Sequence, residues 1–422
     1  MLSSLEQLIS VKSPLTPSDF IPGSETLEML TNYARVLVIG AGGLGCEILK
    51  DLALSGFRDI EVIDLDTIDV TNLNRQFLFR RSDVGEYKAE VAARFIMNRV
   101  SGVKVKAHTC RIQDFDEDFF SSFHIIIAGL DNIEARRWMN SMLHSMVKFN
   151  DDGEAKPETV RPLIDGGTEG FRGQARLIIP YKTACFECTM KMITPQVNFP
   201  LCTIAETPRL PEHCIQYARL IEWEKEFGNK KLDTDSPNDM QWIYQKALER
   251  AEKFGIEGVT YMKTMGVVKN IIPAIASTNA LISAACALEA LKVATYLSYP
   301  IDNYFMYMGQ SGMHSVTFTI EKDPDCLVCS MRPVSIQVKR TSTLRQLLDE
   351  LKTDKYKMTS PAVSGNNGPL YMPKPPSLEE KLRPRLDMTL DELIQQKIYF
   401  GEDLVVTDPT FSNSLTFIIV LE

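Results

Sequence analysis

The chain has 422 residues, of which 44% are hydrophobic and 24% are charged, an ordinary balance for a soluble globular protein. It is too long for one compact core, so two or three domains are expected. The formal net charge of −9 argues against a nucleic-acid partner, because proteins that bind nucleic acids usually present a basic surface.

The N-terminal residues 1–30 contain no motif of their own, and we expect a flexible arm there. They lack the charged-then-apolar layout of a secretory signal. The longest apolar region, 271–297, is interrupted by polar residues, which indicates a buried helix and no membrane partner. The odd number of cysteines, nine, fits a reducing compartment, so we expect a protein of the cytoplasm or nucleus.

Residues 35–66 predict a strand, a helix and a second strand. The apolar run 35–40 ends in glycine, residues 44–55 have helical spacing, and DIEVIDLD follows at 59–66. This β–α–β unit is typical of an α/β fold with a parallel, doubly wound sheet of the Rossmann type. Further elements are expected downstream, namely a helix at 88–100 and strands at 103–109, 124–132 and within 161–180.

The sequence GAGGLG lies between the first strand and helix and contains the glycines Gly40, Gly42, Gly43 and Gly45. The G-x-G-x-x-G spacing permits a tight turn, and the following helix N-terminus offers N–H groups and a positive dipole to phosphate. Asp64 ends the next strand, where a carboxylate accepts hydrogen bonds from ribose hydroxyls. An NAD-dependent oxidoreductase fits these features equally well, and a glycine turn kept only for packing remains an alternative.

Polar residues downstream favour a triphosphate. Asn72, Arg75 and Lys88 supply one amide and two cations, for which a dinucleotide oxidoreductase has no evident need. Asp131 ends another strand, where its carboxylate can hold Mg²⁺ that bridges the phosphates. Each of these charges alone is more typical of a solvated surface group. Together, at successive strand ends, they predict a site for Mg-ATP.

Four cysteines form two C-x-x-C pairs, Cys185 with Cys188 and Cys326 with Cys329. Two such pairs can supply a closed, tetrahedral and therefore structural zinc site. An iron–sulfur cluster and redox-active dithiols are the alternatives. The pairs are too far apart for a local zinc knuckle, so one site would join the two ends of an inserted segment. Of the other cysteines, three are expected in the core: Cys46, Cys110 and Cys286.

The inserted segment, from about 190 to 265, has no strand pattern and is mostly helical. It contains Cys202 and Cys214, and composition alone makes both more typical of a buried core than of a nucleophile. The helix at 271–297 and strands near 302–309 and 314–321 return to the first core. The remaining residues alternate strand, helix and strands, an order that suits a ubiquitin-like β-grasp.

Several motifs together resemble the ubiquitin-activating enzyme superfamily, and within it the catalytic subunits of the heterodimeric neddylation-activating branch. They are VLVIGAGGLGCE, DLDTIDVTNLNRQFLFR, GLDNIEARRW, PLIDGGTEGFRGQAR, the paired C-x-x-C and NFPLCTIAETPRLPEHCI. The resemblance runs from about residue 15 to the C-terminus. The catalytic subunit of the SUMO-activating enzyme shares the general plan and is the alternative.

The resemblance implies five segments. They are an N-terminal arm (1–30), a Rossmann-like adenylation domain in two parts (31–190 and 269–333), a mostly helical catalytic-cysteine domain (191–268), and a ubiquitin-like β-grasp domain (334–422). The last would bind the conjugating enzyme. The family also implies a degenerate regulatory subunit as heterodimer partner and a neddylation-type ubiquitin-like modifier as substrate.

The family reaction has two stages. The modifier's C-terminal carboxylate attacks the α-phosphate of Mg-ATP, and the resulting acyl-adenylate is then attacked by a cysteine thiolate. The resemblance assigns nucleotide binding to the glycine loop together with Asp64, Asp66, Asn72, Arg75, Lys88 and Asp131, with Asp131 also serving Mg²⁺. It assigns the nucleophile to Cys202 and leaves Cys214 in the core. Arg209 and His213 lie nearby in the sequence and are candidates for lowering the thiol pKa.

Arg176, in GQARLI, matches the position that discriminates between modifiers in this branch, where a fixed cation repels a modifier with arginine opposite it. An ordinary strand arginine on a solvated face is the alternative. Two other functions stay open at this point. A sulfur-carrier adenylyltransferase would lack the long insertion and the terminal β-grasp, and a non-catalytic scaffold would lack Cys202 and the cations of the nucleotide site.

Overall fold

The computed structural model describes residues 3–12, 14, 16–192, 204, 206–228, 230, 232–233, 236–268, 275–331, 334–353, 355–401 and 403–421. The chain divides into two compact units, one made of residues 1–192 and 274–422 and the other of residues 193–273. Among the described residues, no helix combines the length and apolar character that crossing a membrane requires.

The first unit contains an eight-stranded sheet in the order β3-β2-β1-β4-β5-β6-β7-β8. Its parallel part consists of β3 (Lys104–His108), β2 (Asp59–Ile63), β1 (Arg35–Ile39), β4 (Ile125–Ala128) and β5 (Leu163–Glu169). Its antiparallel part continues from β5 through β6 (Arg172–Ile178), β7 (Tyr304–Met308) and β8 (His314–Phe318). The predicted α/β fold with a parallel-rich sheet is therefore confirmed.

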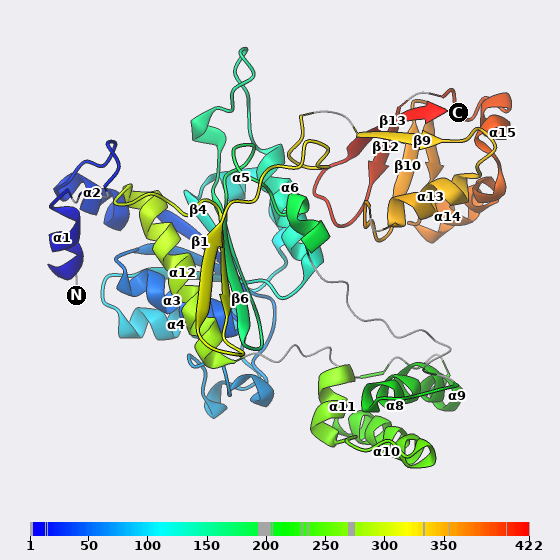
Figure 1. Cartoon of the computed structure of the whole chain (residues 1–422), viewed down its shortest axis with the longest axis horizontal. Coiled ribbons are helices and arrows are strands. Elements are labelled where there is room, and N and C mark those ends of the chain that lie inside the picture. Colours follow the sequence, from blue (N-terminus) through cyan, green and yellow to red (C-terminus); the bar gives the residue numbers. More distant parts are fainter. Residues whose placement is uncertain are drawn as a thin grey trace. The chain divides into compact units, whose positions relative to one another are not determined.

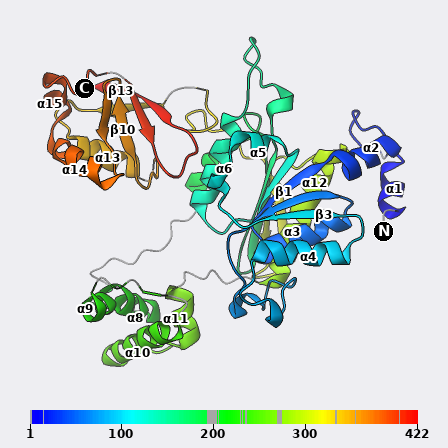
Figure 2. The same ribbon diagram turned by 180° about the vertical axis from the view of Figure 1, so that it is seen from behind.

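Helices cover both faces of this sheet (Figures 1 and 2). One face carries α3 (Gly43–Leu54), α4 (Lys88–Arg99) and α12 (Ala276–Thr295), which pack beside one another. The other carries α5 (Glu117–Ser121) and α6 (Ile133–Ser145). Because both faces are covered, β4, at the centre of the sheet, is apolar along its whole length and all four of its residues are buried. The main core lies between this sheet and the layer of α3, α4 and α12.

Strand order reverses at β1, which lies between β2 and β4. In open parallel sheets, ligands bind outside the carboxyl ends of the strands at such a reversal. The glycine loop follows β1, Asp64 follows β2 and Asp131 follows β4. The sheet topology thus brings these three predicted segments to the same edge.

The second unit is helical. It contains α8 (Pro211–Tyr217), α9 (Trp223–Phe227), α10 (Pro237–Phe254), α11 (Tyr261–Val268) and a π-helical turn at Ala218–Glu222. Helix α10 begins at the cap Ser236 followed by proline, and it ends at Gly255 in the left-handed conformation. The apolar sides of these helices enclose a separate core that includes Cys214 and Trp223.

The C-terminal part of the first unit has its own five-stranded sheet, in the order β11-β10-β12-β13-β9. Its strands are β9 (Val334–Val338), β10 (Ala362–Gly365), β11 (Gly368–Tyr371), β12 (Leu404–Thr407) and β13 (Leu415–Leu421). Its helices are α13 (Leu344–Lys352), α14 (Pro376–Leu382) and α15 (Leu390–Gln395). A capping box between Thr343 and Gln346 fixes the start of α13, whose leucines enter the core of this domain. The predicted order of strand, helix and strands is confirmed.

The N-terminal segment differs from the flexible arm that we expected. It contains α1 (Ser3–Ile9), α2 (Ser24–Glu28) and a π-helical turn at Met29–Tyr33. Phe20 and Ile9 are only 1% and 2% exposed, so apolar contacts order a segment that has no recognisable motif. Shorter 3-10 turns lie at Val70–Asn72, Arg81–Asp83, Ile112–Asp114, Pro157–Thr159, Glu187–Met192 and Arg383–Asp387.

Candidate functional site

The glycine loop is packed so closely that two of its glycines have no room for a side chain. Gly40 has a φ of +98°, which L-residues rarely adopt, and a Cβ there would lie 2.7 Å from the carbonyl oxygen of Gly129. A Cβ on Gly45 would lie 1.9 Å from the carbonyl oxygen of Gly40. These contacts hold the start of α3 against the ends of β1 and β4.

Gly42 is different, because packing within the described chain does not require a glycine there. A Cβ on Gly42 would have only one neighbour within 4 Å, Nε2 of Gln76 at 3.9 Å. The space beside Gly42 is therefore open on the side where the backbone N–H groups of the first turn of α3 begin. A glycine at this position lets a phosphate approach the backbone closely.

The side chain of Asp64 is hydrogen-bonded to this loop. Its Oδ2 accepts a hydrogen bond from the N–H of Ala41 at 2.6 Å, and its Oδ1 accepts one from the N–H of Asp66 at 2.9 Å. Burial raises the pKa of the Asp64 carboxyl, although Lys88 and these backbone donors oppose that effect. The carboxylate thus joins the end of β2 to the glycine loop, at the place predicted for a ribose contact.

Lys88 and Asp66 form an ion pair with 2.8 Å between Nζ and Oδ2. The lysine is the first residue of α4 and is only 8% exposed, whereas the aspartate carboxylate is largely exposed. The backbone N–H of Lys88 also donates to the carbonyl of Asp66 at 2.9 Å. The two residues that the resemblance assigned to the nucleotide are therefore paired with each other beside Asp64.

Arg75 is a half-buried cation without an ion pair among the described residues. Its Nη1 donates to the carbonyl of Thr71 and to Oδ1 of Asn74, both at 3.1 Å. Burial lowers the pKa of the guanidinium, because no carboxylate compensates its lost hydration. Its Cγ would lie 3.5 Å from a Cβ on Gly43, which places the arginine against the first turn of α3.

The side chains of Asn72 and Asp131 each accept one hydrogen bond from a nearby residue. Oδ1 of Asn72 accepts a hydrogen bond from the N–H of Asp69 at 2.9 Å, so it caps a 3-10 turn and leaves its amide nitrogen for other contacts. Asp131 is exposed after β4, and its Oδ1 accepts a 3.3 Å hydrogen bond from Nδ2 of Asn132. Asn132 in turn caps α6. An exposed carboxylate at this edge has the chemistry of a magnesium ligand.

A buried cluster of charges lies next to this edge and was not predicted. Asp165, on β5, is 1% exposed and pairs with both Arg136 and Arg176. Arg136 also donates to the carbonyls of Leu130 and Gly166, and so supports the loop that contains Asp131. The sequence signal was the isolated acid in LIDGG, the third residue of β5 and the one charged residue among its first five.

Arg176 itself is 4% exposed, so the alternative of an ordinary strand arginine on a solvated face is wrong. Its part in discriminating between modifiers stays a prediction. Its Nε donates to Oδ2 of Asp165 at 2.8 Å and its Nη1 to Oγ1 of Thr189 at 2.5 Å. The guanidinium carbon lies 4.6 Å and 5.4 Å from the ring centres of Phe186 and Tyr304. In this structure the residue is a buried partner of Asp165.

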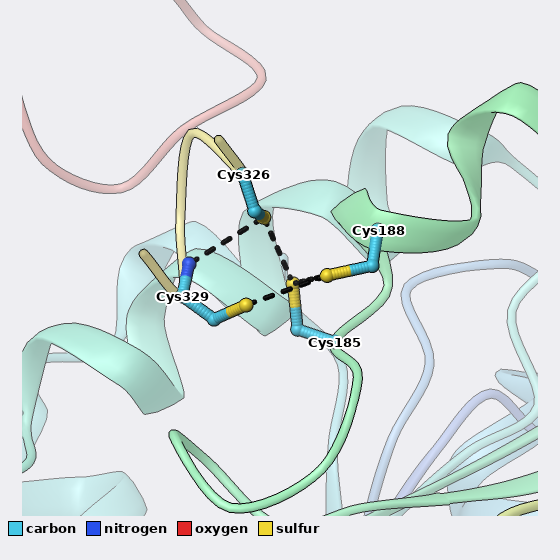
Figure 3. A group of neighbouring side chains, drawn as sticks. All are labelled: Cys185, Cys188, Cys326 and Cys329. Carbon is cyan, nitrogen blue, oxygen red and sulfur yellow. Dashed lines mark hydrogen bonds between the residues drawn. The ribbon is translucent and has the colours of Figure 1, made fainter. Parts of the chain in front are cut away.

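The four predicted metal ligands come together from two segments far apart in the chain (Figure 3). The Sγ atoms of Cys185 and Cys326 are 3.5 Å apart, those of Cys188 and Cys329 are 3.4 Å apart, and those of Cys185 and Cys188 are 3.8 Å apart. These separations are too long for disulfides. They are close to the roughly 3.8 Å expected between sulfurs of a tetrahedral site with zinc–sulfur bonds of about 2.3 Å.

Backbone donors surround the cysteine cluster. The N–H of Asp323 donates to Sγ of Cys188 at 3.4 Å, and that of Val328 donates to Sγ of Cys326 at 3.4 Å. Hydrogen bonds from the neighbouring thiols and from Asp323 lower the pKa of Cys188. Donors aimed at sulfur favour the thiolate form in which cysteine binds a metal.

Cys202 lies outside the described residues, so its surroundings stay a prediction. The other insertion cysteine, Cys214, is buried in the helical core, and burial raises its pKa. Nearby, His213 is 4% exposed and its Nδ1 accepts a hydrogen bond from the N–H of Arg209 at 3.1 Å. Helix α8 begins only at Pro211.

Of the three cysteines expected in the core, two are buried and one is not. Cys46 and Cys286 are fully buried, and burial raises the pKa of both. Cys110 follows β3 and is only partly buried, so the expectation that it belongs to the core is wrong. A cysteine directly after a strand end has little cover when the next segment is a loop.

Two domain families match the chain. Residues 15–328 match the ThiF family, and residues 337–421 match the E2 binding domain. The two matches cover the segments that contain the glycine loop and the strand ends beside it, the cysteine cluster and the C-terminal sheet.

Relatives match almost the whole chain. A NEDD8-activating enzyme E1 catalytic subunit of Dictyostelium discoideum is 49% identical over 421 residues, which cover 97% of this chain and 94% of the relative. A Nedd8-activating enzyme E1 catalytic subunit of Drosophila melanogaster is 48% identical over 424 residues, covering 98% and 93%. The SUMO-activating enzyme subunit 2 of Dictyostelium discoideum is 40% identical over 213 residues and covers only 50% of this chain and 30% of the relative.

Proposed function

Since the chain belongs to the ThiF family and to the NEDD8-activating enzyme E1 catalytic subunits, we propose that it activates a ubiquitin-like modifier with ATP and passes it to a conjugating enzyme. The observation that carries the proposal is the presence of a ThiF region and an E2 binding domain in one chain. A sulfur-carrier adenylyltransferase would need only the first. The modifier is NEDD8, the one that the relatives' names give.

In the first step the C-terminal carboxylate of the modifier attacks the α-phosphate of ATP. A bond forms between the carboxylate oxygen and phosphorus, the bond to the β-phosphate bridge breaks, and pyrophosphate leaves with the electron pair. The side chains at the strand ends carry out this step by positioning and charge neutralisation. Arg75 and Lys88 bind phosphate oxygens, Asp64 binds the ribose, and the N–H groups of α3 face the triphosphate.

Magnesium fits the same edge. Asp131 is an exposed carboxylate directly after β4, and hard oxygen ligands of this kind are what Mg²⁺ prefers. When bound, the ion would neutralise charge on the phosphates. The loop that contains Asp131 is supported from behind by Arg136, which donates to the carbonyl of Leu130.

In the second step the thiolate of Cys202 attacks the acyl carbon of the adenylate. A carbon–sulfur bond forms, the bond to AMP breaks, and AMP leaves with the electron pair, so the modifier is held as a thioester. The burial of the other cysteines supports this assignment. Cys46, Cys214 and Cys286 are buried, and four more belong to the metal cluster. Only Cys110 remains as a competitor among the described cysteines.

Three partners follow from this proposal. They are the modifier, a degenerate regulatory subunit that completes a heterodimer, and a conjugating enzyme that docks on the C-terminal domain. The E2 binding match at 337–421 supports the last of these. We place the reaction in the cytoplasm or nucleus, because a free thiol nucleophile needs a reducing compartment.

The reaction is tested by ATP–pyrophosphate exchange with the full chain, its partner subunit and one modifier at a time. NEDD8 should stimulate exchange, and SUMO should leave it at the level without modifier. Exchange that responds to SUMO and not to NEDD8 would favour the alternative, a SUMO-activating catalytic subunit.

Zinc is the metal that we assign to the cysteine cluster. The four thiols can fill a tetrahedral coordination shell, so the ion would join the segment before the helical unit to the segment before β9 and take no part in the chemistry. Backbone N–H groups already donate to the sulfurs, as they do around structural zinc.

Replacing one ligand tests this assignment. Cys185→Ser should reduce bound zinc from about one ion per chain to almost none and should lower the melting temperature, because a structural ion contributes several kcal/mol to folding. Metal analysis and thermal unfolding measure both effects, with Cys110→Ser as the control outside the cluster. Zinc that stays bound at the wild-type level in Cys185→Ser would refute the assignment.

A further inference from the structure

Two buried carboxamides lie beside the glycine loop, and nothing in the sequence motifs assigned them a role. Gln76 directly follows Arg75 and is 3% exposed, and Asn279 lies in the first turn of α12 and is 2% exposed. They come from segments two hundred residues apart, so only the fold brings them together. Both amide nitrogens lie next to the first turn of α3.

Gln76 has an unsatisfied polar group. Its Oε1 is buried and has no hydrogen-bond partner, and its Nε2 donates no hydrogen bond to the described residues. The group that bears on a phosphate is the free donor Nε2, because phosphate oxygens accept hydrogen bonds and cannot pair Oε1. Its Nε2 is the one atom within 4 Å of a Cβ placed on Gly42, where the space is otherwise open.

Asn279 is oriented by a neighbour. The hydroxyl of Thr168, on β5, donates to Oδ1 of Asn279 at 2.6 Å. Because the oxygen is used in this way, the amide nitrogen is left on the opposite side, and it would lie 2.4 Å from a Cβ on Gly43. The asparagine therefore presents N–H groups to the loop from the α12 side, while Gln76 presents them from the other side.

We propose that Gln76 and Asn279 are polyphosphate-binding residues, whose neutral amide N–H groups donate to the phosphates of the nucleotide at Gly42 and Gly43. The proposal rests on the proposed function, because it takes ATP as the ligand of this loop. Three features converge there: the N-terminus of α3, the half-buried Arg75 without an ion pair among the described residues, and Nε2 of Gln76 beside Gly42. A bound phosphate fixes the orientation of Gln76 in which nitrogen, not oxygen, faces the loop.

Neutral donors suit a site that must release pyrophosphate. Arg75 and Lys88 already supply two positive charges, and a further cation would bind the leaving group more tightly. An amide N–H adds a directed hydrogen bond without changing the net charge of the site.

The test measures nucleotide binding by calorimetry with the full chain and its partner subunit. Gln76→Glu and Asn279→Asp keep the side-chain shape but replace donors with a negative charge. Each should weaken ATP binding by about ten- to a hundredfold, the effect of losing one hydrogen bond to a charged group, and leave adenosine binding unchanged. Gln337→Glu, at an exposed position on β9 of the separate C-terminal sheet, makes the same chemical change and should have no effect.

A second variant at position 76 separates loss of the hydrogen-bond donor from loss of folding. Gln76→Met removes the donor without adding charge, and it should weaken ATP but not adenosine. If wild type binds ATP and all three variants bind it equally well, the inference is wrong and the proposed function stands. Equal weakening of ATP and adenosine would assign the residues to the shape of the site and would also overturn the inference. If wild type itself does not bind ATP, the proposed function fails first.

Discussion

The Cys202→Ala variant is expected to form no thiol-sensitive adduct with NEDD8, while ATP–pyrophosphate exchange continues at the wild-type rate. Exchange needs only the adenylation step, for which no protein nucleophile is required, whereas the thioester needs a thiolate. Non-reducing gels measure the adduct and labelled pyrophosphate measures exchange. Cys110→Ala is the matched control, because Cys110 is the one described cysteine that is neither buried nor part of the four-cysteine cluster.

Two outcomes would contradict this assignment. A thiol-sensitive adduct that persists in Cys202→Ala would mean that another residue is the nucleophile. Loss of the adduct in Cys110→Ala would identify Cys110 as that nucleophile. Loss of both adduct and exchange in Cys202→Ala would mean that the residue supports the adenylation site rather than accepting the acyl group.

The Arg75→Ala variant is expected to lose adenylation, with exchange lower by about a hundred- to a thousandfold, the range seen when one donor to a developing charge is removed. Its stability should not change, because Arg75 has no ion pair among the described residues and its removal leaves no buried acid uncompensated. Exchange assays and thermal unfolding measure the two effects.

Arg81→Ala provides the comparison, since Arg81 is an exposed arginine a few residues along the same segment. It should retain full exchange. If Arg75→Ala exchanges like Arg81→Ala, the guanidinium does not bind the triphosphate. A large drop in melting temperature with Arg75→Ala would mean instead that the side chain supports the fold of the loop.

Much of the fold could be predicted because its signals are local. The apolar run before Gly40 and the glycine spacing after it define a strand, a turn and a helix within a short window. Parallel strands place their carboxyl ends together, so Asp64 and Asp131 could be assigned to one edge from sequence alone. The four predicted zinc ligands are similarly marked by two short motifs, and the structure brings these cysteines together.

Other parts depend on packing between distant segments and have no local signal. Arg176 pairs with Asp165 and does not face solvent, because the face of β6 from which it projects is covered. The presence of one arginine in a strand does not indicate which face of the strand will be covered. Gln76 and Asn279 meet at the glycine loop only because α12 packs on α3. The N-terminal helices are ordered by contacts of Ile9 and Phe20, which no motif marks.

The most direct test of the account is to find which atom of the chain carries the modifier. The full chain is mixed with its partner subunit, Mg-ATP and NEDD8, digested without reducing agent and analysed by peptide mass spectrometry. The account predicts the modifier's C-terminal glycine as a thioester on the peptide that contains Cys202, formed only with ATP. A modifier attached to any other residue, or to Cys202 without ATP, would contradict it.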